Sequence, residues 1–169
     1  AIVTDFDLKP LDEGIDIVIR PSAAARENMN EFVTKMHTAS GLITELDSGT
    51  TVADAQARVL EYVKGHVPEA GKAPLGGNSV GTDKVFLGKQ MPELVGYLHY
   101  RIIDVSSIKE LSRRWYPRVY FNAPKKGGGH RALADITESI AELRYYREAV
   151  FQPQPGLDSA ALREIAARH

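Results

Sequence analysis

Two aspartates stand where a carboxylate could bind a metal ion. Asp83 follows the glycine-rich turn Gly76–Gly81 and falls in the first turn of an expected helix, where the helix dipole favours a negative charge. Ligands gather at such strand ends in open α/β sheets. Taken alone, a carboxylate that only stabilises its own helix is the simpler interpretation, because acidic first turns are common. The turn is not a Walker A loop, since it lacks the Gly-Lys-Ser/Thr ending.

The second aspartate, Asp135, follows His130 along the chain. The two side chains would be ~140° apart on a regular helix of 3.6 residues per turn, so they converge only if His130 precedes the helix. The segment 125–129, which contains three glycines and two lysines, would form such a loop. A histidine there can accept a proton near neutral pH. A surface histidine before an ordinary helix is the alternative, and on its own this is the simpler one.

Six further segments occur around these residues in a fixed order. They are 37–42 (HTASGL), 77–83 (GNSVGTD), 91–94 (MPEL), 99–106 (HYRIIDVS), 109–115 (KELSRRW) and 145–148 (YYRE). Together with His130 and Asp135 they resemble the oligoribonuclease family, which belongs to the DEDD exonucleases that use a histidine base. The resemblance covers roughly residues 1–151. Each segment alone is a weak signal, whereas the ordered set is specific.

The resemblance implies a reaction and its cofactors. Family members arrange four carboxylates around two Mg²⁺ or Mn²⁺ ions, which are hard cations that prefer oxygen ligands. Asp83 and Asp135 match two of the four ligands, and His130 matches the general base that acts on the attacking water. The implied reaction is 3′→5′ hydrolysis of very short oligoribonucleotides, especially dinucleotides, to nucleoside 5′-monophosphates.

The other two family ligands form an Asp-x-Glu pair on a first strand, and this sequence contains no such pair in that place. Asp5 and Asp7 have the spacing, but both are aspartates and both lie too late relative to the expected hairpin, so we reject them. We therefore expect that the N-terminal strand is missing, that the sequence is an incomplete view of the natural protein, and that its metal site is empty or half-formed.

The resemblance also implies how the substrate is held. Phe32 stands where the family places an aromatic ring against a base, although packing in the core is an equal alternative. Ser79, Arg101 and Ser106 match contacts to the terminal 5′ phosphate, which a guanidinium and hydroxyl groups suit. The other predicted substrate-binding residues are His37, Asn78, His99 and Tyr100, the last two supplied by the partner in a homodimer. For positions 99–101 an ordinary polar start to a strand is the alternative.

The elements that position these residues follow from hydrophobic periodicity and from Gly and Pro positions. Strands are expected first, and helices then alternate with strands, which indicates an α/β fold with a mixed sheet flanked by helices; the resemblance makes this ribonuclease H-like. Strands are expected at 1–7, 15–20, 72–77 and 101–105, and helices at 21–40, 52–64, 82–91, 108–115, 133–150 and 157–169. Residues 1–151 form the expected exonuclease domain, and 152–169 a linker and tail helix.

Composition narrows the class of function. The 169 residues carry a formal net charge of −1, which argues against binding long nucleic acids but permits a short oligonucleotide. The absence of cysteine excludes disulfides and cysteine-based zinc sites. With no membrane-length apolar run and no signal-peptide pattern, we expect the cytoplasm. Two alternatives stay open: a proofreading or RNA-trimming exonuclease of the same superfamily, and a non-catalytic dimer that binds short oligonucleotides.

Overall fold

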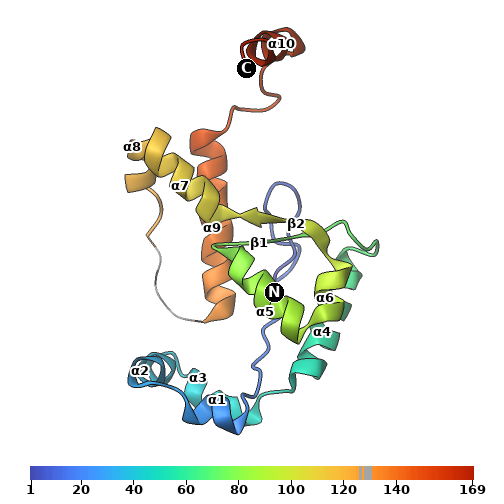
Figure 1. The fold of residues 1–169 in the computed structure, drawn as a ribbon, viewed down its shortest axis with the longest axis vertical. Coiled ribbons are helices and arrows are strands. Elements are labelled where there is room, and N and C mark those ends of the chain that lie inside the picture. Colours follow the sequence, from blue (N-terminus) through green and yellow to red (C-terminus); the bar gives the residue numbers. More distant parts are fainter. Residues whose placement is uncertain (126, 128–130) are drawn as a thin grey trace.

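A parallel two-stranded sheet lies at the centre of the molecule. The computed structural model describes residues 1–125, 127 and 131–169. Strands β1 (Pro74–Gly77) and β2 (His99–Asp104) run parallel and are connected through helices α5 (Val80–Gln90) and α6 (Pro92–Tyr97). Parallel strands need such a crossover connection. The α/β class expected from the sequence is confirmed, with strands and helices arranged as in Figure 1.

The strand register brings two functional segments together. Leu75 pairs with Ile102, and Gly77 pairs with Asp104, so both strands end at the same edge of the sheet. The turn after Gly77 and the helix that begins after Asp104 therefore emerge side by side. Ligand sites in α/β sheets are typical of this edge.

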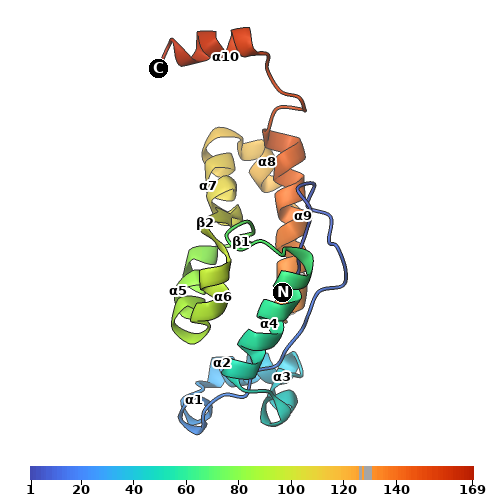
Figure 2. The same ribbon diagram turned by 90° about the vertical axis from the view of Figure 1, so that its right-hand side faces the viewer.

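Two long helices cover this end of the sheet. Helix α7 (Val105–Trp115) starts directly from β2, and α9 (Ala132–Val150) packs against both α7 and β1. Figure 2 shows α9 passing beside the sheet, and α8 (Pro117–Phe121) near the C-terminal end of α9. Tyr146 and Val105 are fully buried in this layer.

A second hydrophobic cluster forms around helix α4 (Val52–His66). Ala55 and Val63 of α4 are buried against Met91 and Leu94. The helix begins at a capped end, because the Thr51 hydroxyl accepts a hydrogen bond from the Asp54 backbone N–H at 3.1 Å. The prediction of this helix is confirmed, and it extends two residues beyond the predicted end at position 64.

The prediction of a regular N-terminal hairpin is wrong. Residues 1–20 form only isolated bridges, between Thr4 and Pro10 and between Ile19 and Thr50. The segment does turn back, because the Ile15 N–H donates to the Ala1 carbonyl at 2.8 Å. Its apolar side chains, including Ile19, pack against the α4 cluster. Scattered backbone hydrogen bonds and the packing of apolar side chains, and not a continuous ladder, therefore hold this segment.

Two prolines begin helices where the sequence predicted that helices end. Pro92 and Pro117 occupy the first positions of α6 and α8, where a missing backbone N–H has no cost because that group would have no partner inside the helix. Neither helix was predicted. The remaining helices are α1 (Ala23–Glu27), α2 (Glu31–Ala39), α3 (Leu42–Glu45), the 3-10 helix η1 (Leu46–Ser48) and α10 (Ser159–Ala166).

The C-terminal helix α10 lies away from the remainder of the molecule in both views (Figures 1 and 2). This placement accords with the division into a domain over 1–151 and a linker with tail helix over 152–169, which stays a prediction. Within the described residues, no helix combines the length and the apolar character needed to cross a membrane.

Candidate active site

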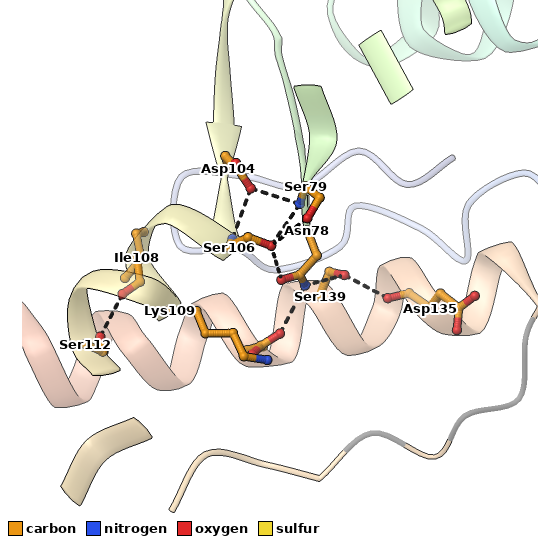
Figure 3. A network of polar contacts seen from close by, with 10 residues as sticks. Asn78, Ser79, Asp104, Ser106, Ile108, Lys109, Ser112, Asp135 and Ser139 are labelled. Carbon is orange, nitrogen blue, oxygen red and sulfur yellow. Dashed lines mark hydrogen bonds and ion pairs between the residues drawn. The ribbon is translucent and has the colours of Figure 1, made fainter. Parts of the chain in front are cut away.

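The turn after β1 is tied to the end of β2 by a compact network of polar contacts (Figure 3). The Ser79 backbone N–H donates to Asp104 Oδ1 at 3.0 Å and to Ser106 Oγ at 2.9 Å. Asp104 is also the N-cap of α7, because the same Oδ1 accepts from the Ser106 backbone N–H at 3.0 Å. One carboxylate oxygen thus joins two chain segments and begins a helix.

Ser79 adopts a backbone conformation that is unusual for a serine. Its φ is +52°, in the left-handed region, which is costly for residues that carry a Cβ. Its hydroxyl lies 3.2 Å from the hydroxyl of Ser106. The fold therefore holds these two predicted substrate-binding residues in direct contact, at the N-terminal end of α5 and α7 respectively.

Asn78 points into the protein and joins the turn to α9. Its Nδ2 donates to Ser139 Oγ and to Glu142 Oε2, both at 3.0 Å, and its Oδ1 accepts from Ser106 Oγ at 3.1 Å. Glu142 is only 2% exposed and forms an ion pair with Lys109 of α7 at 3.0 Å. Three elements, the turn, α7 and α9, meet at this amide group.

The two predicted metal ligands lie in the first turns of different helices. Asp83 belongs to α5 and Asp135 to α9, and both are exposed. Figure 3 shows Asp135 one turn before Ser139, whose hydroxyl donates to the Asp135 carbonyl at 2.9 Å. Carboxylate oxygens suit Mg²⁺ or Mn²⁺. Across residues 1–125, 127 and 131–169, however, no three His, Asp or Glu side chains gather as a metal site.

The predicted base, His130, lies outside the described residues. The position that follows it is fixed firmly. Arg131 forms a two-pronged ion pair with Glu45 of α3, with both N–O distances at 2.9 Å. Hydrogen bonding to this guanidinium lowers the pKa of Glu45. The start of α9 is therefore anchored to α3 through the residue that follows the predicted base in the sequence.

The start of β2 presents an exposed cluster of aromatic and basic groups. The rings of His99 and Tyr100 stack with centroids 4.6 Å apart, and the Arg101 guanidinium lies 5.3 Å from the Tyr100 ring centroid. Tyr100 is 71% exposed. Lys84 of α5 donates a hydrogen bond to the Tyr100 carbonyl. These groups offer flat and cationic surface suited to a nucleotide.

Phe32 and His37 lie on α2, which both views place away from the central sheet, toward one end of the molecule. Phe32 is 73% exposed, which rules out the interpretation that it packs in the core. His37 is half-buried, and its Nδ1 has no hydrogen-bond partner among the residues that the structure describes. The fold thus unites Asn78, Ser79 and Ser106, and it places this pair elsewhere.

Sequence reasoning missed the buried side of the network. Ser139 and Glu142 follow Asp135 at spacings of four and seven residues along α9, which places all three on one face of the helix. A polar stripe of this kind on a helix expected to pack against the sheet was the available signal. Lys109 gave none, because a lysine is ordinarily solvent-exposed.

Known proteins resemble this chain along most or all of its length. A family model described as Exonuclease (RNase T) matches residues 1–143. The oligoribonuclease of Streptomyces coelicolor is 70% identical over 169 residues, which is 100% of this chain and 84% of that protein. The oligoribonuclease of Leifsonia xyli subsp. xyli is 61% identical, covering 92% of this chain and 75% of that protein. The oligoribonuclease of Mycobacterium tuberculosis is 52% identical, covering 99% of this chain and 78% of that protein.

Proposed function

This chain belongs to the oligoribonuclease family of exonucleases, and on that premise we propose that it is a 3′→5′ exoribonuclease that degrades very short oligoribonucleotides to nucleoside 5′-monophosphates. The observation that carries the proposal is the similarity to the Streptomyces coelicolor oligoribonuclease, which is 70% identical in an alignment that spans this whole chain. The contact between Ser79 and Ser106 supports it, because these residues match the family's phosphate-binding positions.

The proposed chemistry assigns a role to each polar side chain. Asp83 and Asp135 provide carboxylate oxygens for divalent cations, Mg²⁺ or Mn²⁺. When bound, such ions supply charge neutralisation at the attacking and leaving oxygens of the phosphodiester. His130 accepts the proton of the attacking water. The two aspartates fit such a cation in the type of donor, but they do not amount to a complete set of ligands.

We assign the selection of short substrates to residues on and beside strand β2 that would bind the terminal 5′ phosphate. Ser79 offers its hydroxyl and Arg101 its guanidinium to a terminal 5′ phosphate, and Ser106, which contacts Ser79, belongs to the same pocket. A pocket that closes over this phosphate leaves no room for a longer chain beyond it. For that reason a dinucleotide substrate is favoured over the long RNA that a trimming exonuclease of the same superfamily requires. Phe32 and His37 complete the proposed substrate contacts through base stacking and near the scissile bond.

We assign His99 and Tyr100 to a shared site in a homodimer, each protomer contributing them to its partner's pocket. The exposed ring of Tyr100 supports this role, because it is available to a second subunit or a substrate. The cytoplasm is the proposed location.

One assay separates the three functions. The purified chain is incubated with a 5′-labelled dinucleotide and a 5′-labelled RNA of about twenty nucleotides, with Mn²⁺, with Mg²⁺ and with a chelator. Metal-dependent cleavage of the dinucleotide alone supports the proposal. Efficient trimming of the long RNA indicates the superfamily alternative. Binding of the dinucleotide without cleavage indicates a non-catalytic module.

A further inference from the structure

We propose that Asn78 and Glu142 form a positioning pair, which holds the serines of the phosphate pocket at a fixed place relative to α9, and that the Asn78 side chain does not contact the substrate. Neither role follows from the sequence, which placed Asn78 among the substrate-binding residues. This inference rests on the proposed function, since it concerns the pocket of Ser79 and Ser106.

The orientation of the Asn78 amide is determined by its neighbours. The Ser139 hydroxyl donates its proton to the Asp135 carbonyl at 2.9 Å, so toward Asn78 it can only accept. Glu142 forms an ion pair with the Lys109 ammonium at 3.0 Å, and a carboxylate in an ion pair also only accepts. Two independent contacts therefore require the N–H₂ group of Asn78 on the α9 side.

That orientation leaves no donor for a phosphate. Both N–H bonds of Asn78 are used, one by Ser139 and one by Glu142. Phosphate oxygens only accept hydrogen bonds, so the Asn78 side chain has no donor to offer them. Its carbonyl oxygen faces Ser106 and accepts that hydroxyl's proton at 3.1 Å. This bond uses the only hydroxyl proton of Ser106, so Ser106 positions Ser79 by accepting from its backbone N–H at 2.9 Å. The Ser79 hydroxyl is then the serine donor that remains for a phosphate.

The result is a continuous chain of hydrogen bonds across three elements (Figure 3). It runs from the Asp135 carbonyl through Ser139 and Asn78 to Ser106 and ends at the Ser79 backbone N–H. A predicted metal ligand and a predicted phosphate contact are thus joined by short, directional bonds. Glu142 holds the middle of this chain in place from a buried position.

A buried ion pair is weak evidence of a contribution to stability, because desolvation offsets much of the attraction. The Lys109–Glu142 pair has a clearer effect on the relative positions of the elements that it connects. Asn78 belongs to the turn, Lys109 to α7 and Glu142 to α9, so the two contacts of this one carboxylate fix the three elements against each other.

The test compares two charge-neutral double variants. Lys109→Met with Glu142→Gln keeps an oxygen that can accept from Asn78. Lys109→Met with Glu142→Met has the same side-chain length but no acceptor. We expect the glutamine variant to bind a 5′-phosphorylated dinucleotide with a KM within about threefold of the natural chain, and the methionine variant to raise KM about tenfold, the effect of one lost hydrogen bond. The same dinucleotide without the 5′ phosphate should show a much smaller difference.

Ser112→Ala is the control for a general loss of stability. It removes another buried hydroxyl of α7, which donates to the Ile108 carbonyl at 2.8 Å outside the network. It should not change the preference for the 5′ phosphate. Equal KM values for the glutamine and methionine variants, with both folded, would overturn the proposed positioning role.

A second measurement does not depend on activity. The side-chain amide protons of Asn78, followed by NMR hydrogen exchange, should be protected in the natural chain and in the glutamine variant but should exchange faster in the methionine variant. Exposed Asn28 provides the reference for an unprotected side chain. Exchange of Asn78 as fast as that of Asn28 would refute the buried contacts. If the natural chain cleaves no dinucleotide, the proposed function fails, while this exchange result still decides where the Asn78 amide lies.

Discussion

Asp104 Oδ1 accepts a hydrogen bond from the backbone N–H of Ser79 at 3.0 Å, across 25 residues of sequence. The same carboxylate caps α7, so one side chain both starts a helix and attaches the turn after β1 to it. Asp104 therefore has a structural hydrogen-bonding role at the junction of β2 and α7.

The first prediction concerns this dual role. Asp104→Ala should lower the free energy of unfolding by about 2 kcal/mol or more, because a lost N-cap alone costs about 1 kcal/mol and the bond to the turn is lost as well. Asp104→Asn, which keeps Oδ1 as an acceptor, should cost less. Urea unfolding provides the measurement. The control is Asp158→Ala, which removes the N-cap of the peripheral helix α10 and should have a smaller effect.

The second prediction concerns the proposed ligands. Asp83→Asn and Asp135→Asn should each reduce dinucleotide cleavage by more than about 100-fold, because even outer partners of metal sites contribute 10–100-fold. The fold should survive, since both side chains are exposed. Asp54→Asn, another first-turn acid, is the matched control and should retain activity. Turnover close to the natural rate in either of the first two variants would remove that residue from the metal site.

The third prediction concerns the shared site. Tyr100→Ala and Asp83→Asn should each impair cleavage, but a mixture with exchanged subunits should recover part of the activity. In a mixed dimer, one of the two sites receives both an intact Tyr100 and an intact Asp83. Subunit exchange is verified by differential tagging. Complete absence of recovery after verified exchange would argue against the shared pocket.

The fourth prediction concerns pH. Burial, with a smaller contribution from the charge of Glu142, raises the pKa of Tyr146 to about 12. A tyrosine in the unfolded chain has a pKa of about 10. The contribution of neutral Tyr146 to the free energy of unfolding is therefore complete below about pH 10, and it declines as the pH rises from about 10 to 12. Tyr146→Phe should therefore reduce the fall in Tm between pH 8 and pH 11.

Tyr145→Phe is the matched control for this experiment. The Tyr146 hydroxyl is buried without a hydrogen-bond partner in the described part of the chain, so its removal at pH 7 should leave stability unchanged or raise it by up to about 1 kcal/mol. The Tyr145 hydroxyl donates to the Val119 carbonyl at 2.7 Å, and its removal should cost about 1 kcal/mol. A larger loss for Tyr146→Phe than for Tyr145→Phe would show that the buried hydroxyl has a partner.

The sequence predicts local structure well where one local signal decides it. Helix α4 follows from Thr51 and Asp54, and α9 follows from its apolar spacing. It fails where tertiary contacts decide, as in the N-terminal segment, whose apolar residues pack on α4 without forming a ladder. Pro92 shows a different limit. The proline correctly predicted the end of α5. It did not predict that the same residue begins α6, because a proline is compatible with the first turn of a helix but does not require one.

The candidate site divides in the same way. Ser79 and Ser106 were predicted from a resemblance, and the parallel register of β1 and β2 places them in contact. Glu142 could not be chosen from composition, because glutamate on a helix is most often exposed. Its burial depends on Lys109 and Asn78, which come from two other elements of the fold.

The left-handed conformation of Ser79 carries a consequence for engineering. A glycine would adopt this φ without steric cost, so a procedure that ranks sequences by folding stability alone would replace the serine. The replacement would remove a hydroxyl from the proposed phosphate pocket. Position 79 is therefore a point of local frustration, where the backbone favours one residue and the chemistry another. Thermostabilised versions of this chain that carry glycine at position 79 should resist unfolding but should discriminate poorly between substrates with and without a 5′ phosphate.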